Sequence, residues 1–185
     1  MSKYDRKQPF RTAKEEVLVV CGGQTEEIYF KAFNKIFRPS LGRVSIVTAV
    51  EAKNPMQIVE YAIKAWQRND AYNAVWCVFD KDDFTDFDEA IIYAEKNGIG
   101  TAFSNQAFEV WFICHFREQN APLNRSQYKR ELTKLLDFEY GKDAATISKV
   151  SEFLLDIDKT NTAIDNARLA YEKHVAFTIP KQPSA

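Results

Sequence analysis

The sequence of 185 residues contains only three cysteines, and none of them has a metal-binding spacing. Cys21, Cys77 and Cys114 lie far apart, in apolar surroundings, and their number is odd. This pattern argues against a disulfide framework and against a cysteine-based zinc site. We expect reduced thiols in the core of a cytoplasmic protein.

Long hydrophobic runs are also missing. Apolar runs such as those at residues 17–21 and 110–114 are far shorter than the roughly 20 residues that span a membrane. The first fourteen residues lack the apolar stretch of a secretory signal. The sequence therefore predicts a protein without a membrane contact.

The sequence has few glycines and prolines, and acidic and basic residues are nearly equal in number. Six glycines and six prolines exclude a collagen-like or low-complexity chain. Twenty-five basic and 26 acidic residues give a formal net charge of −1, so the overall field does not favour nucleic acid. Any affinity for DNA or RNA would be local and modest. The 45% of hydrophobic residues, by contrast, is enough for the core of one domain.

Short apolar runs alternate with helical patterns along the first two thirds of the chain. Strands are predicted over 17–21, 43–50, 74–79 and 99–103, and helices over 25–37, 55–68 and 86–96. Further helices are predicted over 108–117, 126–136, 145–157 and 160–173, with an extended end from residue 177. The alternation predicts an α/β fold: a mostly parallel sheet with helices on both faces, followed by a C-terminal helical segment.

This pattern divides the chain into three parts. We expect a basic flexible tail at 1–14, an α/β core at 15–118 and a helical extension at 119–185 packed on that core. Ligands of such sheets gather at the carboxyl ends of the strands. The predicted strand ends at 21–26, 80–85 and 104–109 should therefore converge.

The densest chemical signal is an acidic segment directly after the buried strand 74–79. Asp80 and Asp82 are separated by one residue, so in an extended segment both side chains point the same way. Carboxylates suit Mg²⁺ or Mn²⁺, which also bind water and phosphate. The simpler interpretation, acids that stabilise a helix N-terminus, fits Asp86, Asp88 and Glu89 better.

Glu109 is the second candidate, in an almost wholly apolar stretch at 107–116. A carboxylate there is costly unless it is paired, coordinated or at an opening. It is either a third metal ligand, a base that activates water, or a carboxylate satisfied at a helix start. His115 nearby is interpreted as a packed helix histidine rather than a ligand.

The turn after the first strand is the third candidate. Gly22 and Gly23 allow close approach of the backbone to an anion, and Thr25 can cap the following helix. The spacing matches neither a Walker A motif nor GxGxxG, so an ordinary tight turn remains the alternative. Glu26 could face the same opening as Asp80.

Three blocks of sequence resemble, in the same order, the signature blocks of RloB-like proteins. They are VLVVCGGQTEEIYFKAF, VWCVFDKDDF and IGTAFSNQAFEVWFICHF, within residues 16–116. Those proteins are relatives of the Toprim domains of topoisomerases, primases and overcoming-lysogenization-defect nucleases. The resemblance implies a Toprim-like sheet, divalent metal at the strand ends, phosphodiester chemistry and a role in bacterial phage defence beside a co-encoded ATPase.

The site residues follow from the resemblance position by position. Asp80 and Asp82 match the Toprim DxD pair that holds Mg²⁺, and Glu109 matches the acid of the Phe-Glu-x-Trp block. The Toprim pattern has a glutamate where this chain has Gly22. Glu26 is the candidate substitute.

We therefore expect a metal-dependent nuclease that uses Mg²⁺ or Mn²⁺, with Glu26 and Glu109 catalytic. The alternative is a Toprim-like subunit without catalysis that binds nucleic acid or a nucleotide for a partner ATPase. A haloacid-dehalogenase-like phosphatase is a third reading, but Thr85 lies three residues after Asp82 rather than two. A homo-oligomer is left open.

Basic residues of a later helix are further candidates for phosphate contacts. They are Lys129, Arg130 and Lys134. A solvated helix face is the better explanation of these three residues.

Overall fold

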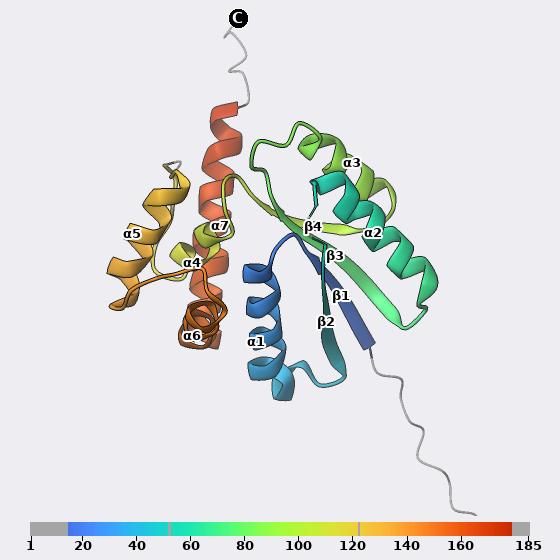
Figure 1. Cartoon of the computed structure of the whole chain (residues 1–185), viewed down its shortest axis with the longest axis horizontal. Helices are drawn as coiled ribbons and strands as arrows, with labels where there is room; N and C mark the ends of the chain where they lie inside the picture. The colour runs from blue at the N-terminus through green and yellow to red at the C-terminus, as the bar shows by residue number, and fades with distance from the viewer. Residues whose placement is uncertain (1–14, 52, 122, 179–185) are drawn as a thin grey trace, which may run out of the picture.

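The structure is a computed structural model that describes residues 15–178 except 52 and 122 (Figure 1). The elements are β1 (Glu15–Cys21), α1 (Gln24–Leu41), β2 (Val44–Val50), α2 (Pro55–Arg68), β3 (Tyr72–Asp80), α3 (Phe87–Lys96), β4 (Gly100–Ser104), α4 (Glu109–Cys114), α5 (Arg125–Leu136), α6 (Ala144–Leu154) and α7 (Ile157–Thr178). This order confirms the predicted α/β class with a C-terminal helical segment.

The four strands form one parallel sheet in the order β2-β1-β3-β4. The central strands β1 and β3 carry continuous apolar runs because both of their faces are covered. Since the strands are parallel and adjacent, the ends of β1, β3 and β4 lie at one edge. In the register, Cys21 pairs with Val78, and Asp80 pairs with Ser104.

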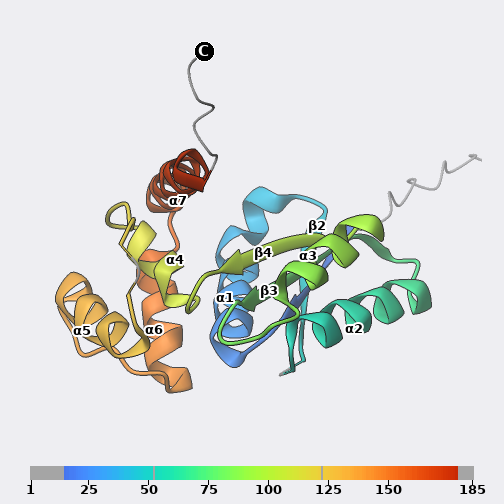
Figure 2. The ribbon, with the colours of Figure 1, turned by 90° about the horizontal axis from the view of Figure 1, so that it is seen from above.

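Successive residues of β1 alternate between two hydrophobic clusters. Leu18 and Val20 pack with α2 and α3, whereas Val19 and Cys21 pack towards α1 and the later helices. Figure 2 shows the sheet between α1 on one side and α2 and α3 on the other. The predicted helices on both faces are thus confirmed.

Helices α4 to α6 share a core with the sheet. Phe112 of α4, Leu132 of α5 and Val150 of α6 are fully buried in the same cluster as Val19. Figure 1 shows this helical group beside α1, away from α2 and α3. The domain boundary at 118/119 stays a prediction.

Two predicted boundaries in this region are wrong. The helix expected over 145–157 ends at Leu154. Leu155 and Asp156 are not helical, and α7 begins at Ile157. The end expected to be extended from residue 177 is still helical to Thr178. The predicted basic tail at 1–14 and the residues after 178 lie outside the described residues.

All three cysteines are buried and free, as expected for core thiols. Burial raises the pKa of Cys77 to about 12 and that of Cys114 to about 11, so both are protonated at neutral pH. Within residues 15–178, apart from the two gaps, no helix is both long and apolar enough to cross a membrane.

Candidate active site

Two of the three predicted strand ends, 21–26 and 80–85, line a cavity of about 180 Å³ at the carboxyl edge of the sheet. The third, 104–109, lies beside it through the Ser104–Asp80 hydrogen bond but is not part of its lining. The β1–α1 turn, the end of β3, the start of α2 and the loop between α5 and α6 all contribute to it. Among its lining residues are the predicted Gly22, Gly23, Thr25, Glu26, Asp80 and Asp82, together with Lys53 and Lys142.

Asp80 is the last residue of β3 and is held by the neighbouring strand. The hydroxyl of Ser104, at the end of β4, donates a hydrogen bond to Asp80 Oδ1. Burial raises the pKa of Asp80, Ser104 lowers it, and the charges of Asp82 and Glu109 raise it further. Carboxylates from the end of β3 and from the start of α4 therefore act on one another here.

Asp82 reaches the cavity by a different route from the one expected. The segment is a turn rather than an extended strand: Phe84 N–H donates to Lys81 O at 3.2 Å, and Asp82 has a φ of 43°. The extended conformation expected for this segment is thus wrong, although Asp80 and Asp82 both line the cavity. Aspartate tolerates this left-handed conformation better than most residues.

Glu26 is the third residue of α1 and is 5% exposed. Its carboxylate folds back over the turn, since a Cβ built on Gly23 would lie 2.9 Å from Glu26 Oε2. Burial raises the pKa of Glu26 to about 7; its own backbone amide lowers it, and the charges of Asp80 and Glu109 raise it. The predicted cap at Thr25 is wrong, because the helix is capped by Gly23 and begins at Gln24.

Replacing Gly23 by alanine is expected to displace the Glu26 carboxylate. The backbone φ of −152° accepts alanine, so the new methyl group acts mainly through its overlap with Oε2. We expect the pKa of the displaced Glu26 carboxyl to fall from about 7 towards its ordinary value of 4.5, because the carboxyl becomes more exposed, with an unchanged circular dichroism spectrum. Titration of the glutamate carboxyls by carbon-13 NMR measures the change. Equal pKa values of Glu26 in Gly23→Ala and wild type would contradict the expectation.

Glu109 begins α4 and is 1% exposed. Its Oε1 accepts a hydrogen bond from the Tyr140 hydroxyl at 2.9 Å and forms an ion pair with Lys142 Nζ at 2.7 Å. The partners of this buried carboxylate therefore come from the loop between α5 and α6. Sequence reasoning missed both, because nothing local connects a Tyr-Gly-Lys loop with a residue some 30 positions earlier.

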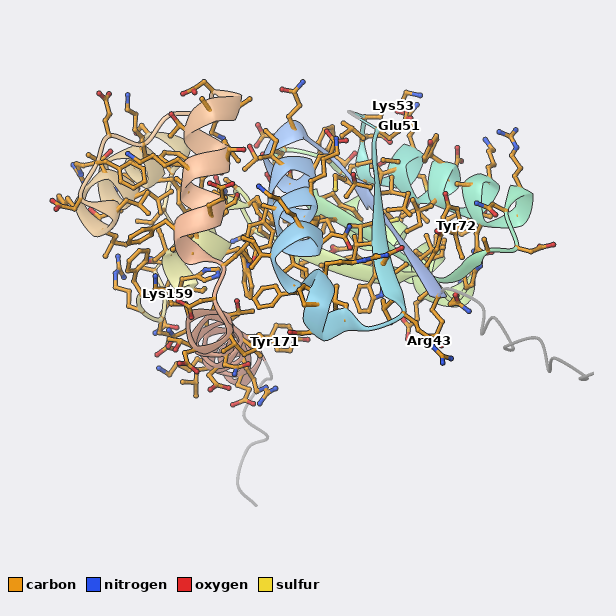
Figure 3. All side chains as sticks on the ribbon, turned by 90° about the horizontal axis from the view of Figure 1, so that it is seen from below. Arg43, Glu51, Lys53, Tyr72, Lys159 and Tyr171 are labelled. Carbon is orange, nitrogen blue, oxygen red and sulfur yellow. The ribbon has the colours of Figure 1, made fainter. Side chains whose placement is uncertain are left out.

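The Tyr140 hydrogen bond predicts a stability effect. In Tyr140→Phe the buried Glu109 loses one of its two donors, which should lower the free energy of unfolding by about 2 kcal/mol. Urea denaturation measures the change. Tyr171→Phe is the matched control, because Tyr171 is 63% exposed on α7 (Figure 3). Equal stabilities of the two variants would show that the hydrogen bond contributes nothing.

The side chains at this edge suit a divalent metal by their chemistry. Carboxylate oxygens are the ligands that Mg²⁺ and Mn²⁺ prefer, and Asp80 and Asp82 line one cavity. Among the described residues, however, no group of three Asp, Glu, His or Cys side chains is arranged to hold a metal ion. Glu109, the predicted third ligand, is held by Lys142 instead. The two aspartates suit such an ion by their chemistry, whereas Glu109 is not among the residues that line the cavity.

A family model described as RloB-like protein matches residues 17–184. The chain belongs to the RloB-like family. This confirms the family resemblance of the three sequence blocks.

Two solved structures show weak likeness to this RloB-like chain. The C-terminal region of the OLD protein of Xanthomonas campestris pv. campestris is 16% identical, with a TM-score of 0.41 over 89% of this chain and 99% of that one. A GDP-L-fucose synthetase from Naegleria fowleri is 14% identical, with a TM-score of 0.33 over 92% and 48%. At these scores neither likeness bears on function. No curated protein sequence matches the chain significantly.

Gly22 of this RloB-like chain occupies a tight position. A Cβ there would lie 3.3 Å from Ile58 Cδ1 and 3.4 Å from both Phe79 Cβ and Val78 O. The glutamate of the Toprim pattern would require these neighbours to shift by a few tenths of an ångström. Glu26 instead supplies the carboxylate next to this turn.

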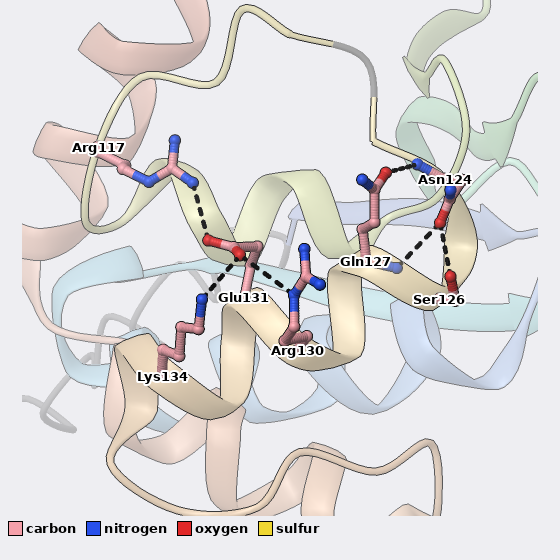
Figure 4. Close-up of polar contacts among 7 residues, drawn as sticks. All are labelled: Arg117, Asn124, Ser126, Gln127, Arg130, Glu131 and Lys134. Carbon is pink, nitrogen blue, oxygen red and sulfur yellow. Dashed lines mark hydrogen bonds and ion pairs between the residues drawn. The ribbon is translucent and has the colours of Figure 1, made fainter.

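The basic residues of α5 are engaged with acidic side chains. Figure 4 shows Glu131 between Arg117, Arg130 and Lys134, with N···O distances of 3.4–3.8 Å. Lys129 pairs with Glu139 at 3.0 Å. These pairs offset much of the positive charge, which favours the solvated-face interpretation.

His115 lies in the core, where the sequence predicted a packed histidine. It is 5% exposed, and its Nδ1 is 2.9 Å from the carbonyl oxygen of Trp111. Burial lowers its pKa.

Proposed function

We propose that this RloB-like chain is a divalent-metal-dependent nuclease, acting in the phage-defence setting that the family resemblance implies. One observation carries the proposal: carboxylates from α1, β3 and the turn after it line one cavity, and Glu109 of α4 influences the pKa values of two of them. Carboxylates that crowd at one cavity and have pKa values raised by burial and by one another are typical of a functional site.

Asp80 and Asp82 would hold Mg²⁺ or Mn²⁺. The bound ion supplies charge neutralisation for the scissile phosphate and a lowered pKa for the attacking water. Hydrogen bonds from the Ser104 hydroxyl and from the Phe108 backbone fix the orientation of the Asp80 carboxylate.

Glu26 is the best candidate for the general base. A carboxylate with a pKa of about 7 accepts a proton near neutral pH, where an ordinary glutamate is a weak base. Gly22, Gly23 and Thr25, at the start of α1, line the same cavity, and a helix N-terminus suits a phosphate oxygen. Lys53, paired with Glu51 at the rim (Figure 3), adds a positive charge beside it.

A cleavage assay tests the proposal. Supercoiled plasmid, linear DNA and RNA are incubated with the protein in Mg²⁺, Mn²⁺ or EDTA, beside Asp80→Ala. We expect cleavage of at least one substrate with metal, none in EDTA, and none by Asp80→Ala. Identical cleavage by both proteins would identify a contaminant and remove the proposal.

The alternative is a subunit without catalysis that binds nucleic acid or a nucleotide for a partner ATPase. It is favoured by the Lys142–Glu109 pair, which removes the third predicted ligand, and by Gly22 in the place of the Toprim glutamate. Metal binding without turnover of any of the three substrates would support this alternative.

A further inference from the structure

The positive charge beside the Glu109 carboxylate is that of a lysine side chain. Lys142 Nζ lies 2.7 Å from Glu109 Oε1, and the Glu109 side chain is only 2% exposed. A buried carboxylate is stable when a positive charge stays beside it. In this structure the ammonium group supplies that charge, at the cavity that also contains Asp80 and Asp82.

The geometry of Lys142 allows this charge to leave. The side chain is 61% exposed, so its stem packs little against the core. The loop stays in place without it, because Tyr140 N–H donates to Thr133 Oγ1 at 3.0 Å and the Tyr140 hydroxyl binds Glu109. Lys142 can therefore turn towards solvent while Tyr140 keeps the loop and the carboxylate together.

Lys53 at the same cavity is different. It pairs with Glu51, whose side chain is 17% exposed, and not with any of the candidate ligands. Its positive charge acts on the cavity only as part of the local field. Comparing substitutions of the two lysines therefore distinguishes direct competition for Glu109 from a general effect of positive charge at the cavity.

We propose that Lys142 is an internal counter-ion that competes with a divalent cation for Glu109. The inference rests on the proposed function, because it concerns the same metal site. The metal-free protein keeps Glu109 neutralised by the ammonium, and binding of the metal requires the ion pair to open. The affinity for metal is then set by the lysine as well as by the carboxylates, and the freed ammonium stays at the cavity where phosphate binds.

Calorimetric titration with MnCl₂ at constant ionic strength tests this inference. Lys142→Met should bind Mn²⁺ more tightly than wild type by a factor of about ten or more, because a unit positive charge next to the ligand is removed. Lys142→Arg, which keeps the charge, should stay within about twofold of wild type, and so should Lys53→Met. Thermal unfolding in EDTA verifies that each variant is folded.

A second readout uses the wild-type protein alone. Acetylation of individual lysines is followed by mass spectrometry with and without Mn²⁺. Release of the ammonium should speed the labelling of Lys142 severalfold on addition of Mn²⁺, while Lys53 is unchanged. This readout remains informative if Lys142→Met does not fold.

The outcomes separate the inference from the proposed function. Equal or weaker Mn²⁺ binding by Lys142→Met, or unchanged labelling of Lys142 on a wild type that binds Mn²⁺, overturns the inference and leaves the nuclease proposal intact. Binding by Lys142→Met but not by wild type supports the inference in its strongest form. If neither protein binds Mn²⁺, the metal site fails, and the inference fails with it.

Discussion

Asp80→Asn is expected to abolish Mn²⁺ binding and, at the same time, to stabilise the metal-free protein. The asparagine keeps the size of the side chain and one oxygen that can accept the Ser104 hydrogen bond. It removes a half-buried charge whose pKa is raised by burial and by the charges of Asp82 and Glu109. The Asp80 carboxylate therefore destabilises the metal-free folded protein, and a bound cation should offset its charge.

Two measurements separate these effects. In calorimetry we expect the affinity for Mn²⁺ to fall by a factor of about 100 or more, because the lost group is a direct ligand. In thermal unfolding with EDTA we expect an unchanged or higher melting temperature. Asp83→Asn is the matched control, since Asp83 is exposed and outside the cavity lining. Loss of stability in Asp80→Asn would mean that the carboxylate is structural, and retained binding would exclude it as a ligand.

The position of the site followed from the sequence because parallel strands leave few choices. Once residues 17–21 and 74–79 are strands separated by helical segments, Gly22 and Asp80 must lie at the same edge. Each of these apolar runs can be recognised from a few neighbouring residues. Together they determine which distant segments of the chain lie side by side.

Other parts of the site were beyond sequence reasoning for physical reasons. The left-handed φ of Asp82 depends on the turn that Lys81 and Phe84 close, and not on the strand before it. Tyr140 and Lys142 reach Glu109 only because α5 packs on α4 and α6 packs on α1, a tertiary arrangement that no local periodicity encodes. A buried acid in an apolar stretch predicts that a partner exists, but not which one.

The pKa of Glu26 leads to the second large expected effect, a stability that depends on pH. The carboxyl ionises near 4.5 in an unfolded chain and near 7 in the folded protein, chiefly because it is buried. Between these pH values the folded state retains a proton that the unfolded state has lost. The contribution of Glu26 to stability is therefore fully present below pH 4.5 and is lost as the pH rises through about 7.

Glu26→Gln should remove this dependence, because glutamine has the same shape and no charge. The difference between 4.5 and about 7 corresponds to about 3 kcal/mol, so Glu26→Gln should exceed wild type by about that amount at pH 8 and equal it at pH 4. Urea denaturation in EDTA across this range measures the difference, and Glu60→Gln on the exposed side of α2 is the control. A constant difference at every pH would attribute the effect to packing rather than to ionisation. If the difference instead grows as the pH rises from 4.5 to about 7, the Glu26 carboxyl ionises near neutral pH in the folded protein. A pKa close to the working pH is the property that a general base at this cavity requires.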